Sequence, residues 1–141
     1  MSLFILDTDT LTLYERGHAR VLQKARSVSP ADLALTIISI EEQLSGWYSA
    51  LRRVTKPDLI ARVYERFTQS IRFLSGIQAQ FLSFPLPAIL RFNALVKLKL
   101  NVGKMDLRIA AIALEHGAVV VTRNIRDFGR VPYLTIEDWS V

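Results

Sequence analysis

The chain has 141 residues, half of them hydrophobic, which is enough apolar surface for one core and excludes a disordered protein. It contains no cysteine, so disulfides and thiolate metal sites are excluded and a reducing compartment such as the cytoplasm is expected. No apolar run approaches the roughly 20 residues of a membrane helix, and the first ten residues lack the features of a secretion signal. Lys and Arg outnumber Asp and Glu by 18 to 13, an excess compatible with a polyanionic partner.

The chain opens with a short strand and a capped helix. The apolar residues Leu3–Leu6 predict a strand that ends abruptly at Asp7. Residues 7–10, DTDT, carry the acidic and hydroxyl side chains that are typical of helix caps, so a helix is expected to begin there. A second, weaker helix is expected over His18–Arg26.

A second strand and a pair of helices follow. The β-branched residues within Leu33–Ile40 predict a strand, and Glu42 comes shortly after it, where a helix should begin. Apolar residues that include Trp47 share one face of that helix, so this tryptophan is expected in the core. A basic turn at residues 52–57 leads to a long amphipathic helix over residues 60–74. Together these two helices predict a helical hairpin.

The segment Gly103–Phe128 has the clearest pattern in the sequence. Apolar residues at positions i, i+3, i+4 and i+7 predict a helix with Asp106 in its first turn. Gly117 tolerates the left-handed conformation that ends such a helix. Ala118–Val121 is a short continuous apolar run, as in strands that are covered on both faces of a parallel sheet. A polar loop is expected after it.

Three weaker elements complete the prediction. A strand is expected over Gln80–Phe84, a helix over Ala88–Leu100, and an edge strand over Leu134–Ile136. The alternation of strands and helices, with no internal repeat or domain boundary, predicts an α/β protein with a parallel sheet.

Four acidic residues are expected at the same edge of the sheet. Parallel strands end at this edge, and the helices that follow them begin there. These residues are Asp7, Glu42, Asp106 and Asp127. Each alone is explained by a helix cap, a helix dipole or a turn. Gathered carboxylates repel one another unless a cation lies between them. An all-oxygen site suits Mg²⁺ or Mn²⁺, and either ion would activate water for attack on a phosphoryl group.

Basic residues flank the acidic positions in sequence, namely Lys104, Arg108, Arg123, Arg126 and Arg130. They would either hold a nucleic-acid backbone around the acidic centre or form a solvated basic rim, and the sequence leaves both interpretations open. The sequence contains no nucleophile elbow, no phosphate-binding glycine loop and no metal-ligand histidine pair.

Three stretches resemble PIN-domain ribonucleases and, within them, the VapC-type toxins of bacterial and archaeal toxin–antitoxin pairs. They are FILDTDTL, ISIEEQLSG, and VGKMDLRIAAIAL followed by VVVTRNIRDFGRVPYLTIEDW, and together they cover nearly the whole chain in order. The resemblance implies that residues 1–141 form one PIN-like domain. This would be a three-layer α/β/α sandwich with a central, mostly parallel sheet and a helical hairpin arm.

The resemblance also implies a site. The acidic residues that bind Mg²⁺ or Mn²⁺ in this family are matched by Asp7, Glu42, Asp106 and Asp127. Asn124 matches a polar catalytic residue beside them. Glu42 is preferred over Glu41 because the family's glutamate stands four positions before a glycine, here Gly46. The substrate-binding set expected here consists of Thr8 and Thr122, which fall at family positions that line the site, and Lys104, Arg108, Arg123 and Arg126.

The activity implied by the resemblance is metal-dependent endonucleolytic cleavage of RNA. The implied partners are a VapB-like antitoxin, clasped by the hairpin arm over Glu41–Gly76, and a second copy of the chain in a homodimer. Two features depart from the family pattern. Asp9 stands where many members carry Asn, so it would either alter metal binding or cap the helix. The segment Phe84–Asn101 lacks acidic residues, which bears on substrate contacts or on the oligomeric surface.

Two other functions remain open from the sequence. Residues 7–11, DTDTL, resemble the nucleophile motif of haloacid-dehalogenase-like phosphatases, in which Asp7 would be the nucleophile. One residue is missing before the Thr-Leu of that motif, and no paired-acid loop matches it. The other alternative is a catalytically silent PIN-like module that binds RNA or a partner, against which the four intact carboxylates argue.

Overall fold

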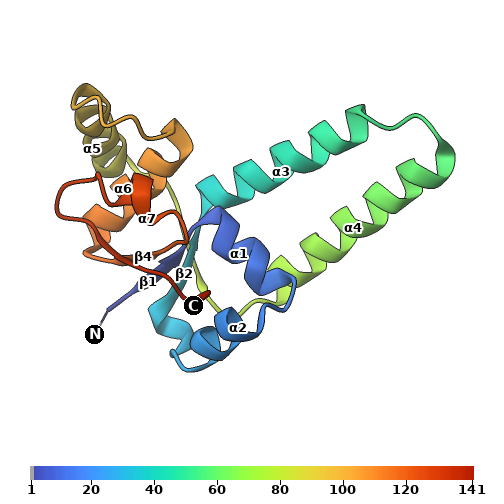
Figure 1. Ribbon diagram of the computed structural model, residues 1–141, viewed down its shortest axis with the longest axis horizontal. Coiled ribbons are helices and arrows are strands. Elements are labelled where there is room, and N and C mark those ends of the chain that lie inside the picture. The colour runs from blue at the N-terminus through green and yellow to red at the C-terminus, as the bar shows by residue number, and fades with distance from the viewer. Residues whose placement is uncertain (1) are drawn as a thin grey trace.

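The computed structural model describes residues 2–141, and Figure 1 shows a β-sheet flanked by helices, from which two long helices project together. In chain order the elements are β1 (Phe4–Leu6), α1 (Thr8–Glu15), α2 (Ala19–Arg26), β2 (Leu33–Thr36), α3 (Ile37–Arg52), α4 (Pro57–Gly76), β3 (Gln80–Leu82), α5 (Leu86–Lys97), α6 (Lys104–His116), β4 (Val119–Val121), α7 (Ile125–Phe128) and β5 (Thr135–Glu137).

Within residues 2–141, five strands form one sheet in the order β3-β2-β1-β4-β5, and every neighbouring pair is parallel. The predicted parallel α/β sheet is therefore confirmed. The central strand β1 pairs on one side with β2, where Phe4 lies opposite Leu33, and on the other with β4, where Leu6 lies opposite Val121. The chain winds outward from β1 in both directions, so the carboxyl end of β1 is a topological switch point, where open sheets commonly bind ligands.

The alternation of side chains along the strands divides the core into two halves. Ile5 and Val120 face one side of the sheet and pack with the buried stretch Ile109–Ala113 of α6 and with α5. Leu6 and Val121 face the other side, where α1 and α2 cover them. Helices on both faces give three layers, as the resemblance implied (Figure 1). In residues 2–141 no helix is long and apolar enough to cross a membrane.

The predicted helical hairpin is present, and it projects from the sheet as an arm formed by α3 and α4 (Figure 1). Trp47 stacks on Phe67 across the hairpin, with ring centroids 5.7 Å apart and an interplanar angle of 7°. Tyr48 meets the same ring edge-on. The prediction that Trp47 lies in the core is wrong, because its apolar face packs against the other helix of the arm.

Several predicted boundaries also differ, and the largest error is the strand over Leu33–Ile40. The strand ends at Thr36, whose Oγ1 accepts the backbone N–H of Ser39 and caps α3, so the β-branched residues Ile37 and Ile38 start a helix. The third strand ends at Leu82, and α5 spans Leu86–Lys97.

The carboxy-terminal part differs from the prediction at two places. The loop after β4 contains the short helix α7, which Asn124 caps. The edge strand is Thr135–Glu137, one residue later than predicted.

Candidate functional site

A cavity of about 490 Å³ opens where β1 ends and where α1, α3 and α6 approach one another. Its lining residues are Asp7, Thr8, Asp9, Thr12, Glu42, Asp106, Arg123 and Asn124. Three of the four acidic residues singled out in the sequence are thus brought together from segments far apart in the chain. The fourth, Asp127, does not line this cavity.

Asp7 ties the end of the central strand to the start of α1. Its backbone N–H donates to Val121 O at 3.0 Å, and its Oδ1 accepts the backbone N–H of Thr10 at 2.8 Å, so it is the N-cap of the helix. The residue is only 4% exposed. Burial raises the pKa of Asp7 above its ordinary value, although hydrogen bonds from Thr122 and Thr10 partly oppose the shift.

Glu42 lies in the second turn of α3 and is held from α1. The Thr8 hydroxyl donates to Glu42 Oε1, and Thr8 Oγ1 lies 3.0 Å from the Oγ of the buried Ser39. This contact joins two helices that begin at neighbouring strands, and it fixes the direction of the glutamate side chain. Thr12, one helical turn after Thr8, also lines the cavity.

Asp106 lies in the first turn of α6 and is half-buried. The pKa of its carboxyl group is raised to about 6, first by burial and then by the negative charges of Glu42, Asp7 and Asp127. These carboxylates therefore repel one another through the cavity, and protonation of Asp106 would relieve part of the repulsion.

Asp127 holds Asn124 in place through hydrogen bonds. Asn124 Nδ2 donates to Asp127 Oδ2 at 3.0 Å, the backbone N–H of Asp127 donates to Asn124 Oδ1, and Arg130 pairs with Asp127 Oδ1 at 3.4 Å. The backbone N–H of Asn124 in turn donates to Oγ1 of the buried Thr122 at 2.8 Å. Asn124 is thus the residue of this group that reaches the cavity.

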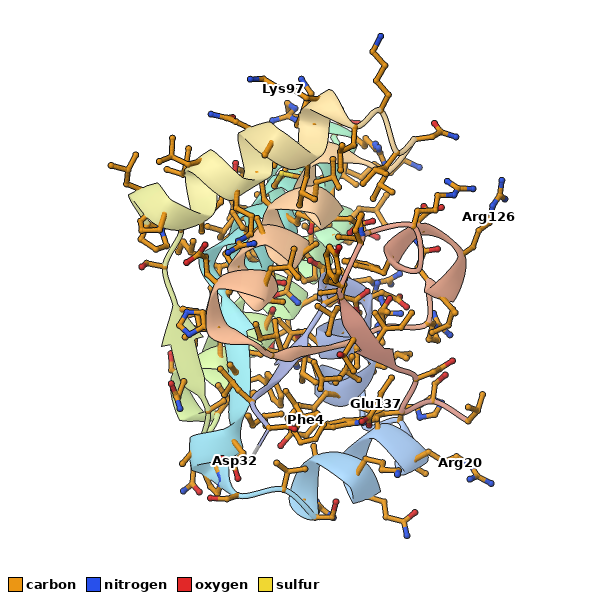
Figure 2. All side chains as sticks on the ribbon, turned by 90° about the vertical axis from the view of Figure 1, so that its left-hand side faces the viewer. Phe4, Arg20, Asp32, Lys97, Arg126 and Glu137 are labelled. Atoms are coloured by element: carbon orange, nitrogen blue, oxygen red, sulfur yellow. The ribbon has the colours of Figure 1, made fainter. Side chains whose placement is uncertain are left out.

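The basic residues do not gather around the carboxylates as a set. Within the described chain, Arg123 is the one basic residue that lines the cavity. Arg108 lies over the ring of Phe92 on α5, at 5.2 Å from its centroid. Arg130 donates to Asn101 O as well as to Asp127. Lys104 and Arg126 are exposed, and Arg126 points away from the body of the molecule in Figure 2.

Arg123 is paired with Asp9, the residue that departs from the family pattern. The two side chains form a two-bond ion pair, and the hydrogen bond and charge of Asp9 raise the pKa of Arg123 further above its ordinary value. The sequence predicted neither this ion pair nor the position of Thr12 in the lining of the cavity. The spacing of Thr12 from Thr8 was a usable signal, whereas no local pattern links residues 9 and 123.

The oxygen donors of the cavity are those that a hard divalent cation prefers, and Mg²⁺ commonly takes one or two carboxylates and completes its coordination with water. Within residues 2–141, however, no three His, Asp or Glu side chains are close enough to form a ready-made metal-binding group. The donor set therefore fits a partly hydrated ion held by one or two carboxylates, not a closed protein cage.

No protein-family model matches the chain. Among curated proteins it is 28% identical over 137 residues to the tRNA(fMet)-specific endonuclease VapC of Salmonella typhimurium, covering 96% of this chain and 97% of that protein. It is 24% identical over 140 residues to ribonuclease VapC1 of Haemophilus influenzae, covering 98% of each.

The fold of the chain is also similar to that of solved structures. The DNA-bound VapBC of Salmonella typhimurium matches with a TM-score of 0.72 and 26% identity over 99% of both chains. VapBC-1 from nontypeable Haemophilus influenzae matches with a TM-score of 0.74 and 24% identity over 99% of both chains. In sequence and in fold, the described chain is therefore similar along nearly its whole length to VapC-type PIN-domain proteins, which confirms the resemblance found in the sequence.

Proposed function

We propose that this protein is an endoribonuclease of the VapC type that uses Mg²⁺ or Mn²⁺ and acts as the toxin of a toxin–antitoxin pair. The observation that supports it best is the convergence of Asp7, Glu42 and Asp106 on one cavity, where burial and then the neighbouring carboxylates raise the pKa of Asp106 to about 6. Full-length relatives named as endonuclease and ribonuclease support the reaction class.

The residues would divide the work as follows. Asp7 and Asp106 are the first candidates to hold the ion, because both line the cavity and, within the described residues, neither carboxylate is engaged by a basic side chain. When bound, a divalent ion supplies activation of water and stabilisation of charge on a phosphoryl oxygen. Glu42, fixed by Thr8, would orient water at the other side of the cavity. Asn124, supported by Asp127, would donate a hydrogen bond to a substrate oxygen.

The direct test compares Asp7→Asn with the wild-type protein. The asparagine keeps a carbonyl oxygen for the helix cap, so the fold should survive. Titration with Mn²⁺ should show an affinity at least about tenfold lower, and RNA cleavage should fall with it. Asp32→Asn is a matched control because Asp32 does not line the cavity. Equal metal binding and equal cleavage by Asp7→Asn and wild type would refute the assignment.

We infer that the arm binds the antitoxin. A groove of about 700 Å³ runs between α1, α3 and α4, and Thr12 lines both this groove and the acidic cavity. The groove is lined by both polar and aromatic side chains, among them Gln43, Arg66 and Phe73, which suits a peptide segment of mixed character. Solved structures similar to this chain are VapBC proteins, which supports a partner of the VapB kind.

A cognate antitoxin supplied as purified protein should bind the chain and suppress RNA cleavage. Ala50→Trp, which fills part of the groove, should weaken that inhibition while cleavage by the free protein persists. Undiminished inhibition would place the antitoxin elsewhere.

A homodimer is also proposed. Large apolar side chains are exposed on α3 and α5, among them Ile37, Tyr48, Leu86 and Leu90, at 48%, 50%, 65% and 59%. Sedimentation of the purified protein tests this, and a monomer at all concentrations would contradict it. No observation favours the phosphatase alternative, since Asp9, the second acid of its motif, is engaged by Arg123.

A further inference from the structure

Asp9 and Arg123 face each other at the exposed margin of the acidic cavity. Asp9 lies in the first turn of α1, and Arg123 lies between β4 and α7, so the pair joins two segments that also carry Asp7 and Asn124. Arg123 Nε donates to Asp9 Oδ2 at 2.7 Å, and Nη2 donates to Oδ1 at 3.1 Å. The side chains are 49% and 51% exposed, so the pair adds little to stability. Its two parallel bonds nevertheless fix the plane of the guanidinium.

The ion pair uses only one edge of the guanidinium group. Asp9 occupies Nε and Nη2, and within residues 2–141 no acceptor contacts Nη1. An arginine held in this way offers a planar, already oriented donor edge, which matches the geometry of phosphate oxygens. Because the side chain is already held, less conformational entropy is lost when a phosphate binds.

The Nη1 edge of Arg123 carries a positive charge at the margin of a mostly negative cavity. The lining contains the carboxylates of Asp7, Asp9, Glu42 and Asp106, and Arg123 is the one cationic side chain among the residues that line it. A polyanion that approaches this margin meets repulsion, and Arg123 is placed to offset it. Asp9 is already neutralised by Arg123, which makes it a poor candidate for an additional metal ligand.

We propose that Arg123 binds a backbone phosphate of the substrate through its Nη1 edge, and that Asp9 is a positioning residue for Arg123, not a metal ligand. This inference rests on the proposed function in that RNA is taken as the substrate. It assigns to Asp9, whose role the sequence left open, the task of aiming a guanidinium at the rim of the site.

The test measures binding and metal affinity separately. Binding of a short fluorescent single-stranded RNA is followed by anisotropy in EDTA, over a range of salt concentrations. Arg123→Gln should weaken RNA binding about five- to tenfold and lower the slope of log affinity against log salt by about one phosphate contact. Asp9→Asn should weaken RNA binding about two- to threefold with an unchanged slope. When Asp9→Asn is added to Arg123→Gln, RNA affinity should not fall further, because Asp9 acts through Arg123. Mn²⁺ affinity of Asp9→Asn, measured by calorimetry, should stay within about twofold of wild type.

Arg91→Gln is the matched control, because Arg91 forms a similarly exposed ion pair with Glu115 on α6 and does not line the cavity. It should bind RNA as the wild type does. Unchanged RNA binding by Arg123→Gln would overturn the phosphate contact. Tighter RNA binding or weaker Mn²⁺ binding by Asp9→Asn, or additive effects of the two substitutions, would overturn the positioning role.

Failure of the proposed function would look different. Wild-type protein that binds RNA but cleaves none with Mg²⁺ or Mn²⁺ would refute the nuclease assignment, and the differences in RNA affinity would still decide between the two roles of Asp9. Wild-type protein that binds no RNA would overturn both proposals.

Discussion

Replacing Asp106 with Asn should stabilise the metal-free protein at neutral pH. The pKa of Asp106 is raised from an ordinary value of 3.8 to about 6, by burial and by the charges of Glu42, Asp7 and Asp127. The folded protein therefore binds a proton more tightly than the unfolded chain does, and stability falls as pH rises from about 4 to about 6. A pKa that is higher by one in the folded state corresponds to about 1.4 kcal/mol of lost stability at high pH. Because Asp106 is only half-buried, solvent screening reduces the destabilisation to roughly 1–2 kcal/mol.

Asn carries no charge, so Asp106→Asn should remove this penalty above about pH 6. Below about pH 4 the two proteins should be equally stable, since Asp106 is then protonated in both states of the wild type. Urea denaturation in EDTA at pH 4, 6 and 7.5 measures the difference, and in excess Mg²⁺ the advantage of the variant should shrink or reverse. Asp32→Asn, which lies outside the cavity, should show no such pH-dependent gap. An Asp106→Asn variant that is no more stable than wild type at pH 7.5 without metal would refute the conclusion that burial and the neighbouring carboxylates destabilise charged Asp106.

Three further substitutions test other parts of the structure. Thr8→Val removes the hydroxyl that holds Glu42 and should lower kcat/KM for RNA roughly tenfold with a small effect on melting temperature; unchanged kinetics would show that Glu42 needs no such support. Gly117→Ala should cost about 1 kcal/mol in urea denaturation, because Gly117 has a φ of +59° and an added Cβ would meet open space. Ile112→Ala should cost roughly 2–5 kcal/mol, since Ile112 is fully buried between α6 and the sheet, and a loss below 1 kcal/mol would contradict that packing.

The fold was predictable from sequence wherever one local signal agreed with the tertiary structure. The apolar spacing before Gly117 and the run Ala118–Val121 predicted α6 and β4 well, because both are buried as their patterns require. The signals conflicted at Thr36–Ile40, where β-branched residues favour a strand but the hydroxyl of Thr36 caps a helix. Trp47 was misplaced for a different reason, since an apolar stripe does not tell which element will cover it.

The candidate site was predictable only in part. Topology alone brings Asp7, Glu42 and Asp106 to one edge, because parallel strands end together there. It does not determine where long side chains point, so Arg108 could not be assigned to the ring of Phe92 in advance. The ion pair of Arg123 with Asp9 joins residues far apart in the chain and depends on the final distance between their segments. No spacing pattern in the sequence predicts that distance.

The distribution of charge explains how a basic protein can present an acidic site to RNA. Four carboxylates and one guanidinium line the cavity, a formal charge of −3, whereas the whole chain carries +5. The remainder of the molecule therefore carries +8, which attracts a polyanion from a distance at low ionic strength. Close to the cavity the sign reverses, and repulsion weakens the binding of a phosphate, which Arg123 offsets in part and a bound divalent ion would offset further. Metal binding and RNA binding should consequently be cooperative, each raising the affinity for the other. Equal RNA affinity with and without a bound divalent ion would show that the acidic cavity does not contact the substrate.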